Sequence, residues 1–389
     1  MTPARAALLL LPVIYLGFIS LGLPDGSLGV AWPRMHRDLG LPIGLAGLIV
    51  AVGTVLSAAA AFSSGKIIAR FKTGPVVLVS CALTGSAMLI VSQAQGLSWL
   101  LVAAVPIGLG AGAVDASLNG YVARHYRGRH MNWLHACWGI GAMCGPLVMA
   151  RLLGTPSGWR VGYFAIGTAQ LALAAIFLCT LRLWDKVPER TTADSDGAGA
   201  SQPPAASANS PAGWLSAAIF VIYVAVETTA GLWAGSILVV SRGIAQESAA
   251  ICVAAYYGSI TGGRIFFGWV VERWGNRRLI NVGTSLALLG TVVFAFAHTS
   301  TLAALGLVLL GLGFAPVYPC LMHEVPKRFA PEAVQTVIGR QSGAAAIGAS
   351  SLPAAAGWLA GVSLESIAWI LIAGVVGLIA AIRRLNRIT

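Results

Sequence analysis

The chain has 389 residues, of which 57% are hydrophobic and 10% are charged, and its mean hydropathy is +0.81. A soluble globular protein of this length needs far more polar surface. We therefore expect an integral membrane protein. The net charge of +12 contains no basic block long enough to bind nucleic acid, so we expect no nucleic-acid partner.

Cysteines and catalytic motifs exclude further classes. The six cysteines lie singly in apolar runs without metal-ligand spacing, so neither a zinc site nor a disulfide framework is indicated. His323-Glu324 does not complete a His-Glu-x-x-His motif, and the sequence has no Gly-x-Ser-x-Gly and no phosphate-binding glycine loop. We expect no enzyme, no metal, no cofactor and no nucleotide-driven pump.

Twelve apolar stretches are long enough to cross about 30 Å of hydrocarbon. The first follows Arg5, is too long for a signal-peptide core and ends in no small-residue cleavage pattern. The twelve predicted helices lie near 6–32, 44–65, 74–93, 97–121, 131–152, 160–183, 213–239, 248–271, 279–297, 301–322, 334–358 and 363–383. The fold class is thus all-α, with twelve transmembrane helices.

A segment rich in Ala, Ser, Pro, Gly and Asp separates the first six helices from the last six. Such a composition buries too little apolar area to fold, and about 27 residues of it span roughly 28 Å on average. We therefore predict an N-terminal six-helix bundle over 1–184, a flexible cytoplasmic linker over 185–212 and a C-terminal six-helix bundle over 213–389.

The basic residues predict the topology. With a cytoplasmic N-terminus, 20 of the 25 Lys and Arg residues fall inside, including the four in 264–278. Five fall outside, namely Arg34, Arg37, Arg151, Arg160 and Arg242. This excess fits the positive-inside rule and accounts for the net charge without an anionic partner. We expect a multi-pass plasma (inner) membrane protein with both termini cytoplasmic.

The two halves look like repeats. Gly108-Leu-Gly and Gly311-Leu-Gly occupy matching parts of helices 4 and 10, which pairs Asp115 with Tyr318, and the Gly145-Pro146 end of helix 5 pairs with Pro353 of helix 11. The loops 65–74 and 268–277 are a second repeated pattern. They lie between helices 2 and 3 and between helices 8 and 9. Parallel repeats of this kind are typical of transporters.

The second loop, Gly268-Trp-Val-Val-Glu272-Arg273-Trp-Gly-Asn-Arg277, resembles the cytoplasmic signature of the major facilitator superfamily. The resemblance covers the whole chain and implies two pseudo-symmetric six-helix bundles. It also implies a cytoplasmic gate formed by Glu272, Arg273 and Arg277, with Arg273 as the partner of Glu272. The first loop departs from the signature, since Ala69 stands where the acid is expected.

Helix 4 carries a carboxylate inside an apolar, glycine-rich run. Gly108, Gly112, Asp115 and Asn119 are spaced by four, three and four residues, so they share one helix face. Ionisable groups at membrane depth usually face a bundle interior or a watery cavity. The alternative is an Asp that snorkels to the interface, although the nearest basic cluster begins nine residues later at Arg124.

Within the superfamily, the run from Asp115 to Val122 resembles the helix 4 pattern acid-x-x-x-Asn-Pro-Tyr of the fucose:proton symporter family, with a glycine in place of the proline. Residues 132–141 are similar to that family's start of helix 5, and Asp25 resembles its helix 1 acid. The resemblance implies that Asp25 and Asp115 handle protons or bind sugar and that Asn119 binds a hydroxyl group.

The residues around Asp25 support a site independently. Pro24 and neighbouring glycines make helix 1 easy to bend or unwind there, and broken helices at membrane depth are where binding sites form. The alternative is that Asp25 lies in a wet extracellular vestibule.

Further polar and aromatic side chains complete the predicted substrate site. Glu227 is a third intramembrane carboxylate and a third candidate for proton coupling; the alternative is a structural ion pair. His135 can donate to a substrate or pass protons, or it can be a satisfied core histidine. The predicted substrate-binding residues are Asp25, Asn119, His135, Trp138, Glu227, Trp233 and Tyr318. Arg340 is expected to snorkel to the interface.

These residues predict a secondary active transporter for a sugar or sugar-like solute, coupled to protons by Asp115, Asp25 and Glu227. Sodium is the other possible coupling ion, because carboxylates and carbonyls also suit it. The alternative function is a proton-coupled drug or metabolite efflux antiporter, since the run from Gly141 to Pro146 partly matches the antiporter pattern of helix 5, although Met149 interrupts its end. The expected partners are a small molecule and the lipid bilayer, and the expected state is a monomer.

The topology gives a first testable prediction. A cysteine that replaces Ser201 in the linker of a cysteine-free chain should react with a membrane-impermeant thiol reagent from the cytoplasmic side only, because 20 of the 25 basic residues are predicted to lie on that side. Labelling is measured in intact cells and in inverted vesicles. Labelling of intact cells would reverse every inside and outside assignment.

Overall fold

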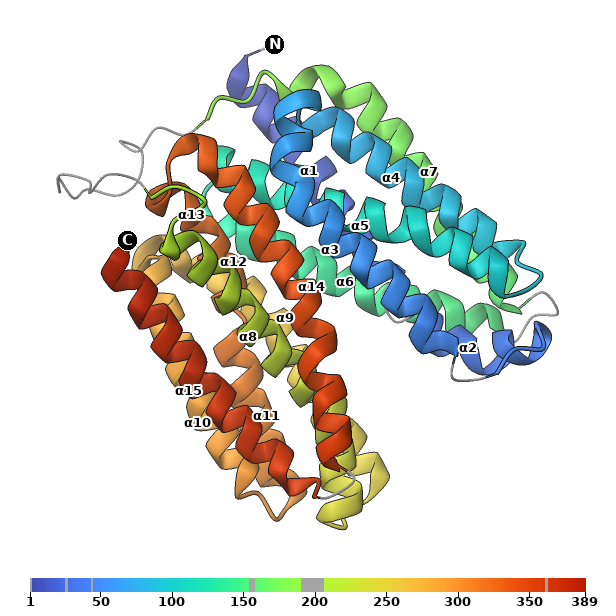
Figure 1. The fold of residues 1–389 in the computed structure, drawn as a ribbon, viewed down its shortest axis with the longest axis vertical. Coiled ribbons are helices and arrows are strands. Elements are labelled where there is room, and N and C mark those ends of the chain that lie inside the picture. Colours follow the sequence, from blue (N-terminus) through green and yellow to red (C-terminus); the bar gives the residue numbers. More distant parts are fainter. Residues whose placement is uncertain (1, 25–26, 43–44, 154–157, 190–205, 361–362) are drawn as a thin grey trace. The chain divides into compact units, whose positions relative to one another are not determined.

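The structure is a computed structural model that describes residues 2–24, 27–42, 45–153, 158–189, 206–360 and 363–389. Asp25 and most of the predicted linker lie outside the described residues. The chain is almost entirely helical (Figure 1). The helices are α1 (Pro3–Gly22), α2 (Ser27–Asp38), α3 (Leu45–Phe71), α4 (Thr73–Ser92), α5 (Leu97–His125), α6 (Gly128–Leu153), α7 (Gly158–Trp184), α8 (Pro211–Ser236), α9 (Gln246–Trp274), α10 (Asn276–Ala295), α11 (Ser300–Phe314), α12 (Val317–His323), α13 (Val325–Arg328), α14 (Val334–Ala360) and α15 (Glu365–Ile388).

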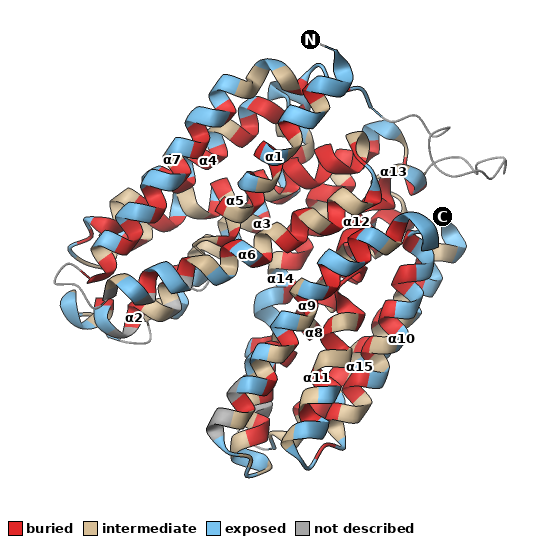
Figure 2. Cartoon of the chain, turned by 180° about the vertical axis from the view of Figure 1, so that it is seen from behind, coloured by how far each residue is buried: buried red, intermediate tan, exposed pale blue. Residues whose placement is uncertain are grey.

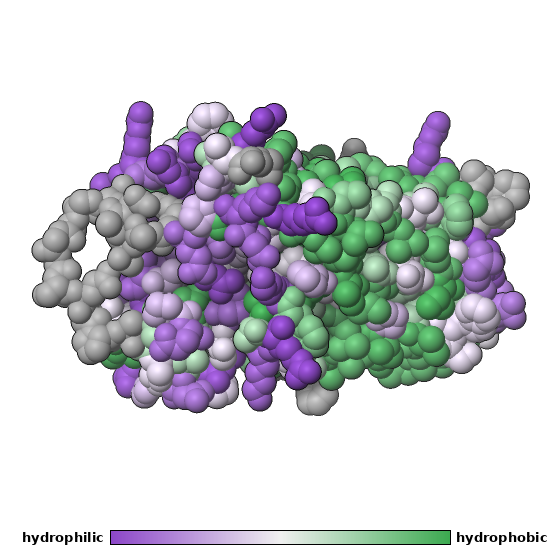
Figure 3. All heavy atoms as spheres, turned by 90° about the horizontal axis from the view of Figure 1, so that it is seen from above, coloured by the Kyte–Doolittle hydropathy of each residue, from purple (hydrophilic) through white to green (hydrophobic). Residues whose placement is uncertain are grey.

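Each of the twelve predicted segments contains one or two of these helices. Among the described residues, nine helices are long and apolar enough to cross a membrane. The other long helices, α6, α9 and α14, have 26, 29 and 27 residues. Many large hydrophobic side chains are exposed, and Figure 3 shows apolar residues over much of the visible surface. A surface of this kind requires hydrocarbon around it, so the chain is an integral, multi-pass membrane protein.

Two of the twelve predicted helices are interrupted. Predicted helix 1 is divided into α1 and α2, and α1 ends at Gly22 where the sequence predicts a break. Predicted helix 10 is divided into α11 and α12 by the turn at Ala315 and Pro316. A proline removes one backbone donor and cannot continue the hydrogen-bond ladder of a preceding helix, which explains the second interruption.

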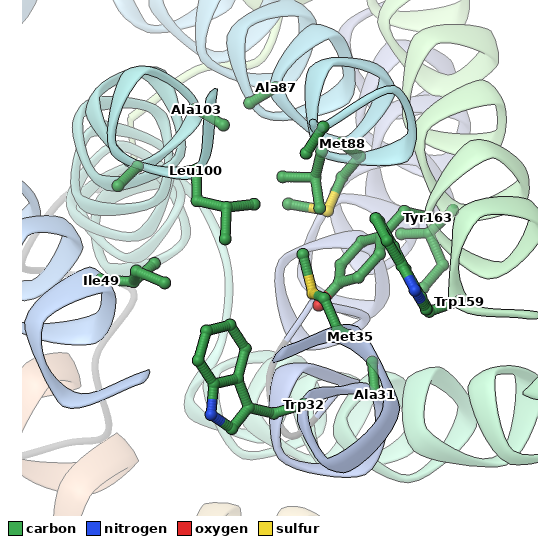
Figure 4. Close-up of a cluster of buried hydrophobic side chains, with 14 of the residues drawn as sticks. Ala31, Trp32, Met35, Ile49, Ala87, Met88, Leu100, Ala103, Trp159 and Tyr163 are labelled. Carbon is green, nitrogen blue, oxygen red and sulfur yellow. The ribbon is translucent and has the colours of Figure 1, made fainter. Parts of the chain in front are cut away.

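The end of predicted helix 1 at residue 32 is wrong, because α2 continues to Asp38. Trp32 and Met35 are buried in a cluster with side chains of α4, α5 and α7 (Figure 4). The Trp159 indole nitrogen also donates to Asp38 Oδ2 at 2.8 Å. Tertiary packing therefore extends the helix past the last strongly apolar residue of its sequence.

The chain divides into two compact units, one of residues 1–125 and 134–194 and the other of residues 126–133 and 195–389. We call them unit 1 and unit 2. In unit 1, α4 packs against α5 and α7, α3 packs against α5, and α1 packs against α7. In unit 2, α10 packs against α11 and α15, α9 packs against α11, and α8 packs against α15. The same pairing scheme occurs twice, and buried residues line the inner sides of the helices (Figure 2).

The Gly-Leu-Gly repeats have the same packing role in both units. A Cβ atom on Gly108 would collide with the Gly53 carbonyl of α3, and one on Gly110 would lie 2.7 Å from the Ser80 carbonyl of α4. In unit 2, a Cβ atom on Gly311 would lie 2.6 Å from the Tyr256 carbonyl of α9, and one on Gly313 would lie 2.6 Å from the Gly283 carbonyl of α10. Residues two apart on a helix point in nearly opposite directions. Each motif therefore lets one helix approach two neighbours at once.

The repeated loops share a backbone conformation. Lys72 before α4 has φ 63° and ψ 164°, and Gly275 before α10 has φ 73° and ψ 155°. These two positions correspond when the loops 65–74 and 268–277 are aligned. A positive φ is unfavourable for lysine and easy for glycine. Its retention at Lys72 shows that the turn geometry is imposed by the helices on either side.

Arginine side chains also cap equivalent helix ends in the two units. In unit 1, Arg160 donates to the Ser92 and Ala94 carbonyls at 3.2 and 2.8 Å, at the end of α4. In unit 2, Arg242 donates to the Phe294 and Ala297 carbonyls at 2.6 and 2.9 Å, at the end of α10. The last carbonyls of a helix lack intrahelical partners and carry partial negative charge. Both arginines, predicted to lie outside, therefore cap helix ends.

The glycine packing gives a second prediction. Gly313→Ala should lower the free energy of unfolding by about 1–3 kcal/mol, because the new methyl group meets the backbone of α10. The matched control is Gly377→Ala on α15, where no heavy atom lies within 4 Å of the added methyl group. Thermal unfolding in detergent measures both variants. Equal midpoints for the two variants would contradict this packing.

Candidate functional site

A hydrogen-bonded chain of three polar side chains lies in unit 1. Asn119 Nδ2 donates to Asp115 Oδ1 and to the Asp115 carbonyl, each at 3.0 Å. His135 Nε2 lies 3.0 Å from Asn119 Oδ1. Because the Asn119 amide nitrogen points at the carboxylate, its oxygen is the acceptor and His135 carries its proton on Nε2. The structure therefore brings three of the predicted site residues together.

The three side chains of this hydrogen-bonded network differ in their burial. Asn119 is fully buried and His135 is 6% exposed, whereas Asp115 is partly exposed. Asp115 precedes the end of α5 at His125 by ten residues, or about 15 Å along the helix. Phe18 of α1 covers the His135 ring edge-on, with 5.3 Å between the ring centroids. The carboxylate is the accessible end of a polar network that is otherwise enclosed.

The helix packing beside this network explains two glycines of α6. A Cβ atom on Gly141 would collide with the Ile19 carbonyl of α1, and one on Gly145 would collide with the Leu23 carbonyl. Trp138, one turn before Gly141, is partly exposed on the same helix. Close contact with α1 therefore holds the segment that carries both His135 and Trp138.

A buried ion pair lies in unit 2. Arg264 Nη2 of α9 lies 3.4 Å from Glu227 Oε1 of α8, and their side chains are 5% and 16% exposed. The sequence analysis gave a structural ion pair as the alternative for Glu227. The structure contains such a pair. Arg264, which the topology prediction counts with the basic residues 264–278, lies within α9, ten residues before the end of the helix.

Aromatic side chains surround this pair. The Tyr256 hydroxyl donates to the Glu227 carbonyl at 2.9 Å, and the Tyr223 hydroxyl donates to the Phe314 carbonyl at 3.1 Å. The Tyr318 ring lies 5.8 Å from that of Tyr223. The predicted residues Glu227 and Tyr318 therefore lie around one aromatic cluster. The Trp233 indole nitrogen instead donates to the Pro353 carbonyl of α14 at 3.1 Å.

The predicted gate residues form two separate clusters in unit 2. Glu272 pairs with Arg129 at 3.2 Å and with Arg127 at 3.7 Å. Among the described residues, no ion pair joins Glu272 to its predicted partner Arg273. Arg277 instead pairs with Glu324 at 3.1 Å.

Glu324 is the centre of the second cluster. It is 3% exposed, and it accepts hydrogen bonds from Asn276 and Arg277 at 3.1 Å each and lies 3.4 Å from Arg328. Burial acts to raise the pKa of Glu324, but the charges of Arg328 and Lys327 and the hydrogen bonds from Asn276 and Arg277 outweigh it, so the pKa lies below its usual value. Glu324 therefore stays charged at neutral pH.

Sequence reasoning missed two important residues. The topology count places Arg264 with the basic residues 264–278, although it stands inside the apolar run and the predicted helix that end at Val271. A cation in such a run is itself a signal for a buried carboxylate partner. Glu324 enters the sequence analysis only as part of an incomplete metalloprotease motif. Its pairing with Arg328 has the i,i+4 spacing that a sequence can show, whereas no local pattern indicates its contacts with α10.

Nearly the whole chain matches one family of membrane proteins. The model of the major facilitator superfamily matches residues 14–339 and 215–387. The chain belongs to the major facilitator superfamily. Its all-α membrane fold, with two similar helical units, is that of the family.

Solved structures of this superfamily share the fold. The transporter FucP in its outward conformation has a TM-score of 0.74 at 13% identity, with 98% of this chain and 99% of that chain covered. The proton:xylose symporter XylE has a TM-score of 0.73 at 14% identity, with 97% and 95% covered. The human organic anion transporter MFSD10 has a TM-score of 0.72 at 16% identity, with 98% and 100% covered.

One curated relative matches part of the chain. It is the niacin transporter NiaP of Acinetobacter baylyi, 29% identical over 184 residues. The match covers 46% of this chain and 40% of the relative.

The Glu272 cluster gives a third prediction. Glu272→Gln should lower the population of the outward-facing state by a few fold, because a cytoplasmic ion pair biases alternating access if it forms in one state and breaks in the other. A partly exposed pair contributes about 0.2–1 kcal/mol. Distances between spin labels on the cytoplasmic face measure the population. Glu332→Gln is the control, since Glu332 is exposed; a shift of equal size in both variants would remove the gating role of Glu272.

Proposed function

We propose that this chain is a secondary active transporter that moves a small polar solute, a sugar or sugar-like molecule, together with protons by alternating access. The observation that carries the proposal is the network of Asp115, Asn119 and His135 in unit 1. It offers a titratable carboxylate at the accessible end of an enclosed set of hydrogen-bonding side chains. The network has the parts that proton-linked solute binding requires.

The chemistry follows from the protonation of Asp115. A charged carboxylate accepts the hydrogen bond from Asn119, and a neutral carboxyl group can still accept it through its carbonyl oxygen. The neutral form gains an O–H group that can donate to a solute hydroxyl, and it avoids the free energy of a charge withdrawn from water. Solute and proton therefore bind Asp115 cooperatively in this proposal.

Two of the similar structures support proton-linked sugar transport, because FucP is a fucose:proton symporter of E. coli and XylE is a proton:xylose symporter. The niacin transporter supports a small metabolite of a different kind. We propose Asp25, Trp138 and Tyr318 as further substrate contacts, together with the ring of Trp233, whose indole nitrogen is bound to the Pro353 carbonyl. We also propose the single chain as the functional unit. Sodium is the other possible coupling ion. The uptake assay below tests it when choline replaces sodium in the medium.

The glycines behind the antiporter alternative also have a packing role. The glycines of α6 that resemble the antiporter pattern, Gly141 and Gly145, are accounted for by close packing against α1. Proton-coupled efflux antiport remains the alternative proposal, and the direction of proton movement separates the two.

The fourth prediction concerns Asp115→Asn, which mimics the protonated carboxyl group. The variant should still exchange solute across the membrane but should lose accumulation driven by an acid-outside gradient, since it has no proton to bind or release. The measurement is uptake of labelled fucose, xylose and niacin by proteoliposomes, with and without the gradient. Asp185→Asn is the matched control, because Asp185 is exposed and pairs at the surface with Lys72.

The outcomes separate the roles of the carboxylates. Asp25→Asn should impair binding itself if Asp25 is a direct ligand. Gradient-driven accumulation at the wild-type level by Asp115→Asn would leave Asp115 as a residue of helix packing and would remove it from the coupling mechanism.

A further inference from the structure

The first predicted membrane helix is interrupted in unit 1, where α1 ends at Gly22 and α2 begins at Ser27. The Ser20 carbonyl in the last turn of α1 accepts a hydrogen bond from Gln170, which lies near the centre of the 27-residue span Gly158–Trp184 of α7. The interruption therefore lies near the middle of the membrane. Backbone groups at this depth have no water to bond, so a group that loses its helical partner needs another one from the protein.

Pro24 removes one backbone donor at this interruption. In a continuous α-helix the N–H of residue 24 donates to the carbonyl of residue 20. Leu23 still has helical φ and ψ angles of −57° and −41°, and its N–H donates to the Ile19 carbonyl at 3.1 Å. The nitrogen of Pro24 is thus placed for the next bond of the helix, but it carries no hydrogen. The Ser20 carbonyl therefore needs a donor from another helix.

Gln170 supplies that donor. Its Nε2 donates to the Ser20 carbonyl at 2.9 Å. Gln170 is only 1% exposed, and among the described residues its Oε1 has no hydrogen-bond partner. A buried acceptor without a partner is unfavourable, so the favourable contribution of Gln170 comes from its N–H group. Ser27 has the same role for the Leu23 carbonyl, to which its Oγ donates at 2.7 Å.

The turn of α1 that this hydrogen bond holds also packs against α6. A Cβ atom on Gly22 would collide with the Trp138 carbonyl. Phe18 belongs to the same turn and covers the His135 ring edge-on, with 5.3 Å between the ring centroids. The last turn of α1 is therefore bonded to α7 and packed against α6. Since the contact with α6 leaves no free space, a shift of this turn changes the positions of His135 and Trp138.

We propose that Gln170 is a positioning residue of the transport site in unit 1. It supplies the hydrogen bond that Pro24 cannot make, holds the last turn of α1 at the interruption, and thereby fixes the part of α6 that carries His135 and Trp138. This inference rests on the proposed solute site. Gln170 acts through the α1 backbone and not by contact with the solute, so a backbone N–H restored at position 24 should make its amide unnecessary.

The test is a double-mutant cycle of Gln170→Met and Pro24→Ala in the full chain. Methionine has about the length of glutamine but no amide, and alanine at position 24 provides an N–H group for the Ser20 carbonyl. The thermal midpoint and the hydrogen exchange of the α6 backbone amides over residues 135–145 are measured in lipid nanodiscs. Neither measurement needs a solute, so the cycle tests the positioning role even if the proposed solute class is wrong.

Gln170→Met alone should lower the thermal midpoint by about 2–8 °C and speed the exchange of the α6 amides. In the Pro24→Ala background the same substitution should have less than half of each effect. Gln341→Met is the matched control, because Gln341 in unit 2 is also 1% exposed and donates to Ser216 Oγ at 2.6 Å. Its effect on the midpoint should be equal in both backgrounds, and the α6 exchange should not change.

Exchange of labelled fucose, xylose and niacin by proteoliposomes connects the cycle to transport. For a transported solute, Gln170→Met should raise the half-saturation concentration by about 2–10-fold, and by less in the Pro24→Ala background. Equal effects of Gln170→Met in both backgrounds, or unchanged exchange of the α6 amides, would overturn the positioning role. Wild-type chains that exchange none of the three solutes would count against the proposed solute class, while the cycle still decides the role of Gln170.

Discussion

Hydrocarbon does not solvate charge, and the arrangement of polar groups in this protein follows from that constraint. In the described residues of unit 2, the deep cation Arg264 faces Glu227, and Arg242 is bound by Glu365 and by helix-end carbonyls. In unit 1, the Asp115 carboxylate receives a hydrogen bond from Asn119. A change of protonation at one of these carboxylates alters the local charge balance, and this links proton binding to whatever else the cluster contacts.

The repeated architecture supplies the frame for these clusters. Paired glycines in α5 and α11, equivalent positive-φ turns before α4 and α10, and arginine caps on the same two helices recur in both units. The Asp115 carboxylate does not recur, because Asp115 corresponds to Tyr318 in the aligned repeats. The duplicated part of the sequence therefore specifies packing, and the differences between the copies specify the two polar clusters.

Hydropathy and glycine spacing predict most of the fold, because apolar length and close helix contact are local properties of a sequence. The extension of α2 to Asp38 depends on burial of Trp32 and Met35 by distant helices, and no local signal predicts it. The same holds for the partners of Glu227 and Glu272, which lie 37 and more than 140 residues away in the chain. Residue type marks a site, but only the packed structure assigns its ion pairs.

The central claim is that solute and proton move in the same direction. Its most direct test is the external pH of a weakly buffered suspension of proteoliposomes when fucose, xylose, niacin or glucuronate is added outside without an imposed gradient. Symport predicts that a transported solute makes the external medium more alkaline as protons enter, and that this change is absent in Asp115→Asn. Acidification of the medium would demonstrate antiport, and transport of a solute with constant pH would contradict proton coupling.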